Sequence, residues 1–183
     1  MKASFTIFMK LLLLTIFISL ISCSTIKEDF IKDWNKVQLI RLDENLDELE
    51  LYLDTIKLKY KDTEFESQID SLLQVINLEK MQEIKESKYN PFPQDSGDCS
   101  HPNKKYTKII TFNDTKYILT LRYVGVENQR YLIPPQGKIG IKLLNGSYDV
   151  SASVPPEYYV RDFYGKHNLT GCEYDSKFYI IIK

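Results

Sequence analysis

The chain has 183 residues, of which 43% are hydrophobic and 27% are charged, and its formal net charge at pH 7 is -1. This composition excludes a fully disordered chain, the length excludes a large two-domain enzyme, and the charge gives no concentrated basic face for nucleic acid. All 7 glycines and all 7 prolines lie between Pro91 and Gly171. The first half therefore has no residue that interrupts a regular backbone.

Residues 1–22 have the layout of a signal peptide. Lys2 and Lys10 precede an uncharged, mostly apolar stretch, LLLLTIFISLIS, over residues 11–22. This core is shorter than the roughly 20 apolar residues that a membrane-spanning helix needs. We expect a cleaved signal rather than a permanent transmembrane helix.

The sequence Leu20-Ile21-Ser22-Cys23 resembles the lipobox of bacterial lipoproteins, in which an aliphatic residue, a tolerant position and a small residue precede a cysteine. The resemblance implies that Cys23 becomes the acylated N-terminus of the mature chain. Acyl chains contribute about 0.8 kcal/mol per buried CH2, so several of them form a stable membrane anchor. Ser24 resembles the second mature residue of outer-membrane lipoproteins, facing either the periplasm or the cell surface. An ordinary secretory signal with a chance cysteine is the alternative.

Residues 23–88 predict helices. Phe30, Trp34 and Val37 form one apolar stripe, and a second stripe in a different register continues to the end of the first predicted helix. The second stripe has the 3-4 spacing of heptad a and d positions: Leu39, Leu42, Leu46, Leu49, Leu53, Ile56 and Tyr60. We expect one continuous helix over residues 39–60.

Thr63 and Glu66 have the spacing of a capping box, which predicts the start of a second helix that ends before Asn90-Pro91. Its apolar stripe consists of Phe65, Ile69, Leu72, Leu73, Ile76, Met81 and Ile84. A helical hairpin is favoured, and a coiled-coil stalk is the alternative. The heptad face then packs within one chain, or it mediates self-association or binds a partner helix.

Residues 89–98 predict a linker, and residues 99–183 a small domain of six or seven short antiparallel strands. Apolar residues there alternate with a period of 2, and Asn145-Gly146 is typical of a type I′ hairpin. The predicted strands are 106–112, 116–124, 130–133, 138–144, 148–154 and 177–182. The expected fold class is α+β, with an immunoglobulin-like β-sandwich after the helices.

Pro135-Gln136-Gly137 followed by Leu144-Asn145-Gly146-Ser147-Tyr148-Asp149-Val150 resembles a hairpin of small transthyretin-like and PEGA-type β-domains. Those domains are mostly non-catalytic spacers or binding modules, and the resemblance implies such a role here.

Cys99 and Cys172 remain after acylation of Cys23 and predict one disulfide in a secreted chain. A loop of this size gives a chain-entropy stabilisation of roughly 4 kcal/mol. A metal site that combines these cysteines with His101 and His167 is disfavoured, because the chain has no CxxC or HxxxH spacing.

Four aromatic residues form the candidate ligand platform: Tyr158, Tyr159, Phe163 and Tyr164, on an expected loop after Pro155-Pro156. Such rings stack on sugars or peptides, or they cover the open end of a core. The chain has no GxSxG, HExxH, P-loop or GxGxxG motif, so we expect no enzyme, catalytic residue, metal or cofactor.

The sequence thus predicts an outer-membrane lipoprotein of the cell envelope that acts as a non-catalytic interaction or structural module. Two alternatives stay open. One is a carbohydrate- or peptidoglycan-binding module that uses the aromatic loop, and the other is an assembly subunit that binds an envelope protein through the heptad helix.

Replacing Cys23 with Ala removes the only thiol that the lipobox offers for acylation. We expect the Cys23→Ala chain to remain unacylated and to leave the membrane fraction. Mass spectrometry and membrane fractionation measure the two effects, and fractionation unchanged from the wild type would contradict the anchor.

Overall fold

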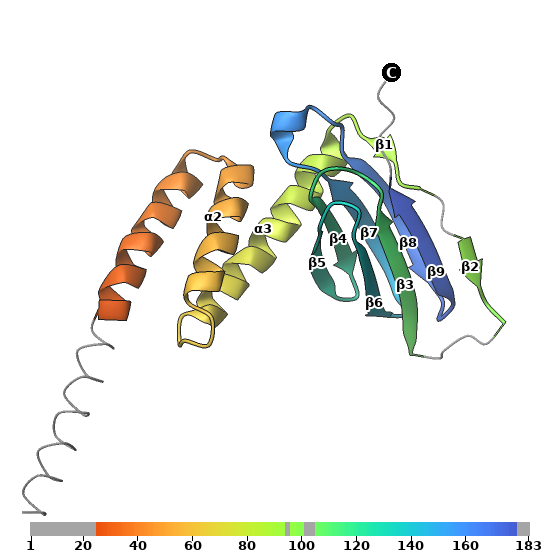
Figure 1. Ribbon diagram of the computed structural model, residues 1–183, viewed down its shortest axis with the longest axis horizontal. Helices are drawn as coiled ribbons and strands as arrows, with labels where there is room; N and C mark the ends of the chain where they lie inside the picture. The colour runs from red at the N-terminus through yellow and green to blue at the C-terminus, as the bar shows by residue number, and fades with distance from the viewer. Residues whose placement is uncertain (1–24, 94–95, 101–104, 179–183) are drawn as a thin grey trace, which may run out of the picture. The chain divides into compact units, whose positions relative to one another are not determined.

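The computed structural model describes residues 25–93, 96–100 and 105–178. The fold is α+β, with helices first and strands after them (Figure 1). The chain divides into two compact units, residues 1–70 and 71–183, which are described in turn. The predictions for Cys23 and for the last residues of the C-terminal strand fall outside the described residues.

The predicted continuous helix over residues 39–60 is wrong. Residues 25–42 are helical, the chain then turns, and α2 (Leu46–Lys59) begins as a separate helix. Glu44 in the turn has a φ of 55°, which ends the first helix. The Asn45 side chain accepts a hydrogen bond from the backbone N–H of Glu48 at 3.1 Å and so caps α2.

Because the helix is broken, only part of the heptad stripe is buried. The last four residues of the stripe are buried: Leu49, Leu53, Ile56 and Tyr60. Leu39 and Leu42, by contrast, are 63% and 78% exposed. Their helix buries Phe30, Val37 and Ile40 instead.

Aromatic rings fill the space between these helices and the next turn. The ring of Phe30 stacks on Phe65 with centroids 4.0 Å apart, and it meets Tyr60 edge-on at 5.2 Å. Trp34, the single tryptophan of the chain, stacks on Phe30 at 5.4 Å.

Asp33 adds a polar link between the first helix and α2. Its carboxylate accepts hydrogen bonds from Tyr60 Oη at 2.7 Å, Lys59 Nζ at 2.8 Å and Tyr52 Oη at 2.9 Å. Burial raises the pKa of Asp33, but the hydrogen bonds from Lys59, Tyr60 and Tyr52 outweigh it and hold the pKa below its ordinary value. The charged form of Asp33 therefore stabilises this unit.

The turn over residues 60–65 leads into α3 (Glu66–Glu86) near the predicted point. The cap differs from the predicted box, because the Glu66 carboxylate accepts from the N–H of Asp62 at 2.8 Å rather than from Thr63. The Thr63 hydroxyl accepts from the N–H of Phe65 at 3.3 Å. The predicted apolar stripe is confirmed within α3, where Ile69, Leu72, Leu73, Ile76, Met81 and Ile84 are buried, whereas Phe65 lies half-buried in the turn before the helix.

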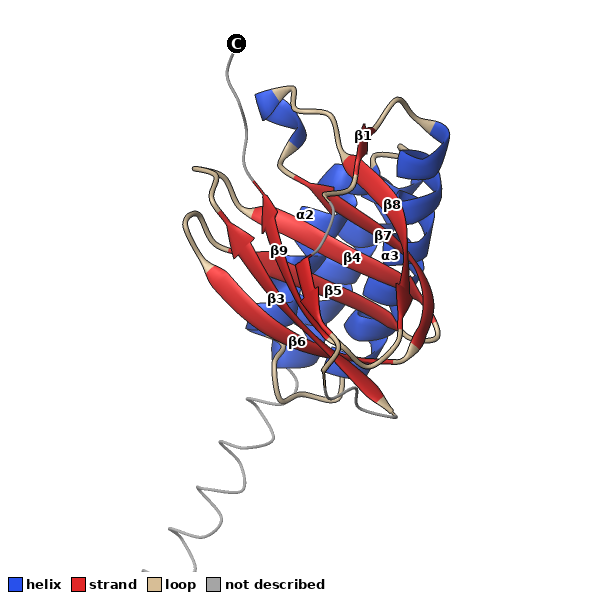
Figure 2. Ribbon diagram, turned by 90° about the vertical axis from the view of Figure 1, so that its right-hand side faces the viewer, coloured by secondary structure: helices blue, strands red, loops and turns tan. Residues whose placement is uncertain are grey.

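The second unit contains two sheets that enclose one core (Figure 2). The five-stranded sheet has the order β1 (Asn90–Pro91), β8 (Phe163–Leu169), β7 (Gly146–Ser153), β4 (Leu119–Gly125) and β5 (Asn128–Ile133). The four-stranded sheet has the order β2 (Ser96–Asp98), β9 (Glu173–Phe178), β3 (Tyr106–Asn113) and β6 (Lys138–Leu144). These bounds and orders refer to the described residues.

Three features of this sandwich differ from the prediction. The strands are not all antiparallel, because β1 pairs with β8 and β3 with β9 in parallel. Strand β8 occupies residues that lack clear alternation, including the end of the expected loop. The predicted linker over residues 89–98 is also incorrect, since it contributes β1 and β2 to the sheets.

Asn145-Gly146 does not form the predicted hairpin, because β6 and β7 belong to different sheets. The chain crosses from one sheet to the other at this point. The Asn145 side chain accepts a hydrogen bond from Thr107 Oγ1 at 2.9 Å. Gly146 has a φ of 148°, and a Cβ there would lie 2.3 Å from Val126. Glycine is therefore required for a sheet-to-sheet crossing rather than for a two-residue turn.

The C-terminal part of α3 covers the outer face of the five-stranded sheet. Met81 and Ile84 are buried with Tyr164, and Val124 packs against them. The Tyr164 hydroxyl donates a hydrogen bond to Asp149 at 2.7 Å. Burial and this hydrogen bond raise the pKa of Tyr164.

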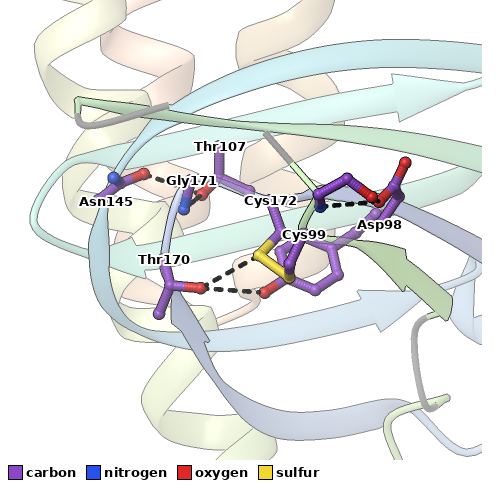
Figure 3. The surroundings of a disulfide bond; sticks show 9 residues. Asp98, Cys99, Thr107, Asn145, Thr170, Gly171 and Cys172 are labelled. Atoms are coloured by element: carbon purple, nitrogen blue, oxygen red, sulfur yellow. Dashed lines mark hydrogen bonds between the residues drawn. A yellow bond between two sulfur atoms is a disulfide. The ribbon is translucent and has the colours of Figure 1, made fainter. Parts of the chain in front are cut away.

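The structure contains the predicted disulfide between Cys99 and Cys172, whose Cα atoms are 4.5 Å apart (Figure 3). Cys99 follows β2 and Cys172 precedes β9. Next to the disulfide, the N–H of Gly171 donates to Thr107 Oγ1 at 2.8 Å. The bond thus fixes the entry into the last strand.

Reduction of the disulfide is expected to lower the free energy of unfolding of the second unit by about 4 kcal/mol. A Cys99→Ala/Cys172→Ala chain should melt at the temperature of the reduced wild type, with and without reductant. Thermal unfolding followed by circular dichroism measures this effect. Two reactive thiols in the native, unreduced protein would contradict it.

Replacing Asp33 with Asn keeps the shape but removes the charge, and is expected to destabilise the first unit by roughly 1–3 kcal/mol at neutral pH. Since the folded pKa lies below the unfolded value of about 3.9, this stabilisation is present above about pH 4 and is lost as the pH falls through the folded pKa. The Asp33→Asn variant should therefore lose less of its free energy of unfolding on acidification than the wild type does.

Fluorescence of Trp34 during urea unfolding reports on this unit. The matched control is Asp29→Asn, because Asp29 is exposed and its contact with Lys32 is 3.9 Å long. Equal losses of stability in the two variants would rule out the Asp33 link.

Candidate functional site

The predicted aromatic loop divides into an exposed part and a buried part. Tyr158 and Tyr159 are 44% and 96% exposed, and they lie at the end of the 3-10 turn η1 (Pro156–Tyr158). Phe163 and Tyr164 do not lie on the loop, because they are the first residues of β8. Phe163 packs against Phe178 with ring centroids 5.7 Å apart, and Tyr164 is 7% exposed. Only Tyr158 and Tyr159 are therefore available as ligand contacts.

The backbone holds Tyr159 in an unfavourable conformation. Its φ of 54° and ψ of 31° are in the left-handed region, which costs a non-glycine residue roughly 1–2 kcal/mol. The turn is stabilised by hydrogen bonds from the N–H of Tyr158 to the oxygen of Pro155 and from the N–H of Tyr159 to that of Pro156, at 3.2 and 3.0 Å. A strained residue with a fully exposed ring is typical of functional surfaces.

A third, half-buried tyrosine from another loop joins the two exposed ones. The ring of Tyr117, in the connection between β3 and β4, stacks on Tyr158 with centroids 4.0 Å apart and an interplanar angle of 30°. Lys116 Nζ lies 5.3 Å from the centre of the Tyr117 ring. We call Tyr117, Tyr158 and Tyr159 the aromatic platform. The sequence pattern assigned Tyr117 to the predicted strand 116–124, whereas β4 begins only at Leu119.

Asn113 fixes the loop that carries Tyr117. Asn113 is 1% exposed, and its amide nitrogen lies 2.7 Å from the carbonyl oxygen of Tyr117, 2.9 Å from that of Ile133 and 3.0 Å from that of Pro134. Its side-chain oxygen accepts from the N–H of Thr115 at 3.1 Å. The amide has two protons, so it can bond two of the three carbonyls at a time. This buried amide links two loops at one end of the sandwich.

The other side of the platform is tied to β1. The N–H of Asn90 donates to the oxygen of Asp162 at 2.8 Å, and its side-chain amide donates to the oxygen of Arg161 at 3.2 Å. The loop between β7 and β8 is therefore held at the end that enters β8, while Tyr158 and Tyr159 in its middle are exposed. Such preorganisation lowers the entropic cost of binding a ligand.

The platform presents groups that can contact a ligand. The platform offers ring faces for stacking, and Glu157 and Arg161 are exposed beside it as hydrogen-bonding groups. Within the described ranges, no three His, Cys, Asp or Glu side chains gather as a metal site would require. In the same residues, no helix has the length and apolar character to cross a bilayer.

Comparison with known proteins gives no relative from which to assign a ligand. No protein-family model matches the chain, and no curated protein sequence matches it.

Proposed function

We propose that the chain is a non-catalytic binding module of the bacterial cell envelope, anchored through acyl chains on Cys23, with the aromatic platform as its ligand surface. The observation that carries this proposal is the 96% exposure of Tyr159 on a strained, two-proline turn. An exposed ring held at a conformational cost has no stabilising role in the fold. Its role is best explained by contact with another molecule.

Two other features support the envelope setting. The disulfide is typical of oxidising compartments such as the periplasm and the cell surface. Helical segments over residues 25–86 lie in the chain between the anchor and the sandwich. In the proposal, the sandwich acts as an immunoglobulin-like scaffold that presents loops at its end.

We infer that the ligand of the platform is a carbohydrate, such as the glycan of peptidoglycan. Tyr159 offers a ring face on which a sugar could stack, and the neighbouring Glu157 and Arg161 side chains provide hydrogen bonds to hydroxyl groups. The alternative of an assembly subunit has less support, because most of the heptad face is buried within the chain and only Leu39 and Leu42 of it are strongly exposed.

Replacing Tyr159 with Gly tests the platform without damaging the fold. Glycine tolerates the positive φ, so the variant should be as stable as the wild type or more stable by about 1 kcal/mol. Loss of the ring should weaken glycan binding at least fivefold, if a sugar stacks on the ring with the roughly 1–3 kcal/mol that a nucleobase gains on an aromatic side chain.

Calorimetric titration of the full chain in detergent with N-acetylglucosamine oligomers and soluble peptidoglycan strands measures the affinity. Leu132→Ala, which removes a 46% exposed side chain on β5, is the matched control and should bind normally. Undiminished binding by Tyr159→Gly would contradict the platform, and a wild type that binds none of these glycans would contradict the carbohydrate class.

A further inference from the structure

The outer face of the four-stranded sheet contains a groove of about 620 Å³. The strand register places its side chains in rows. One row crosses all four strands and consists of Asp98, Glu173, Lys108 and Lys142. The next row consists of Asp175 on β9, Ile110 on β3 and Gly140 on β6. The groove lies over these two rows and uses no residue of the aromatic platform.

Gly140 leaves the groove open. A Cβ at this position would have no atom within 4 Å, so no neighbouring group requires a glycine. Its φ is also outside the positive range that favours glycine. Glycine within a strand lowers stability and often marks the close approach of another molecule. With Ile110 beside it, the floor of the groove is apolar.

The two sides of the groove have opposite charge. Lys108 and Glu173 neutralise each other in the middle of the first row, with Nζ and Oε1 2.6 Å apart. On the β9 side, the exposed carboxylate of Asp175 remains. On the β6 side, Lys142 lines the groove, and Lys138 lies just beyond it in the following row on the other side of Gly140; both lysines are exposed on the same face.

Both lysines are positioned by aromatic rings. Lys142 Nζ lies 4.1 Å from the centre of the Tyr106 ring, and Lys138 Nζ lies 4.7 Å from that of Phe112. In the described part of the chain, neither lysine has an ion pair with a carboxylate. A negative group on a ligand would therefore meet two cations on the edge strand that are not neutralised within the protein.

We propose that this groove binds a short peptide with a free carboxylate and a free ammonium group. The carboxylate lies between Lys138 and Lys142, the ammonium group lies at Asp175, and an apolar side chain covers Ile110 and Gly140. Strands β9 and β6 are two strand spacings apart, or about 10 Å. An extended peptide of three residues spans roughly this distance. The charge complementarity selects a peptide with two free ends rather than a uniformly charged polymer.

The test is a titration of the isotopically labelled full chain in detergent micelles with the peptide Ala-Leu-Ala, followed by NMR. We expect saturable shifts of the Gly140 amide and the Ile110 methyl resonances. N-acetylation or C-amidation of the same peptide should each weaken binding at least fivefold, because each removes one charge. Equal affinity of the free and doubly capped peptides would overturn the proposal.

Gly140→Ile fills the groove with a strand-favouring residue that meets no clash. The variant should melt at or above the wild-type temperature and bind the free peptide at least tenfold more weakly, as judged from the Ile110 resonance. Lys138→Gln/Lys142→Gln should abolish the difference between the free and the C-amidated peptide. Lys85→Gln is the control, because Lys85 on α3 pairs with Asp149 on β7 at 3.4 Å, outside the four-stranded sheet.

Two further outcomes separate this groove from other occupants and from the platform. If the Gly140 resonance shifts with protein concentration and sedimentation shows a dimer, a second copy of the chain occupies the face and the peptide proposal is wrong. The Tyr159→Gly variant should bind the peptide normally. If the glycan-binding experiment contradicts the aromatic platform, the peptide titration therefore still tests the groove independently.

Discussion

The second unit depends on the insertion of the last strand, β9, between β2 and β3. Strand β9 is antiparallel to β2 and parallel to β3, so the four-stranded sheet is complete only when the C-terminal residues have taken their place. Both proposed binding surfaces use this strand. Its outward residue Asp175 supplies the carboxylate on the acidic side of the groove, and the oxygen of Phe178 accepts from the N–H of Asp114 in the loop that leads to Tyr117.

Pairing of strands that are distant in sequence has an entropic cost, because a long loop must close before the contacts form. The disulfide joins residues 73 positions apart and removes part of this cost from the unfolded chain. Phe178 then enters the core at 1% exposure, which supplies apolar burial for the same strand. The disulfide and the burial of Phe178 therefore both stabilise β9 in its place in the sheet. The two proposed ligand surfaces are arranged around this strand.

Much of the fold follows from local patterns in the sequence. The change of hydrophobic period separates helices from strands, and the predicted bounds of β6 agree with the structure at both ends. The sequence also contains a signal for the helix break at residues 43–45, because Asn45 caps α2 by accepting a hydrogen bond from the N–H of Glu48. The heptad spacing continues across the break, so the apolar pattern alone predicts one continuous helix. The sheet to which each strand belongs was not predictable, since Asn145-Gly146 has the same chemistry in a hairpin as in a crossing between sheets.

The two candidate sites were also not predictable, because they are formed by contacts between segments that are distant in the sequence. Tyr117 meets Tyr158 through tertiary contacts, and Gly140 faces Asp175 through the register of three strands.

Hydrogen–deuterium exchange of the full chain tests the central position of β9 most directly. If β9 lies inside the sheet, the amides of residues 173–175, which pair with both β2 and β3, exchange as slowly as those of β3 and become exposed together with them when denaturant is added. Rapid exchange of residues 173–175 while β3 stays protected would show that β9 is an independent edge, and would contradict the account of the sandwich and of both surfaces built on it.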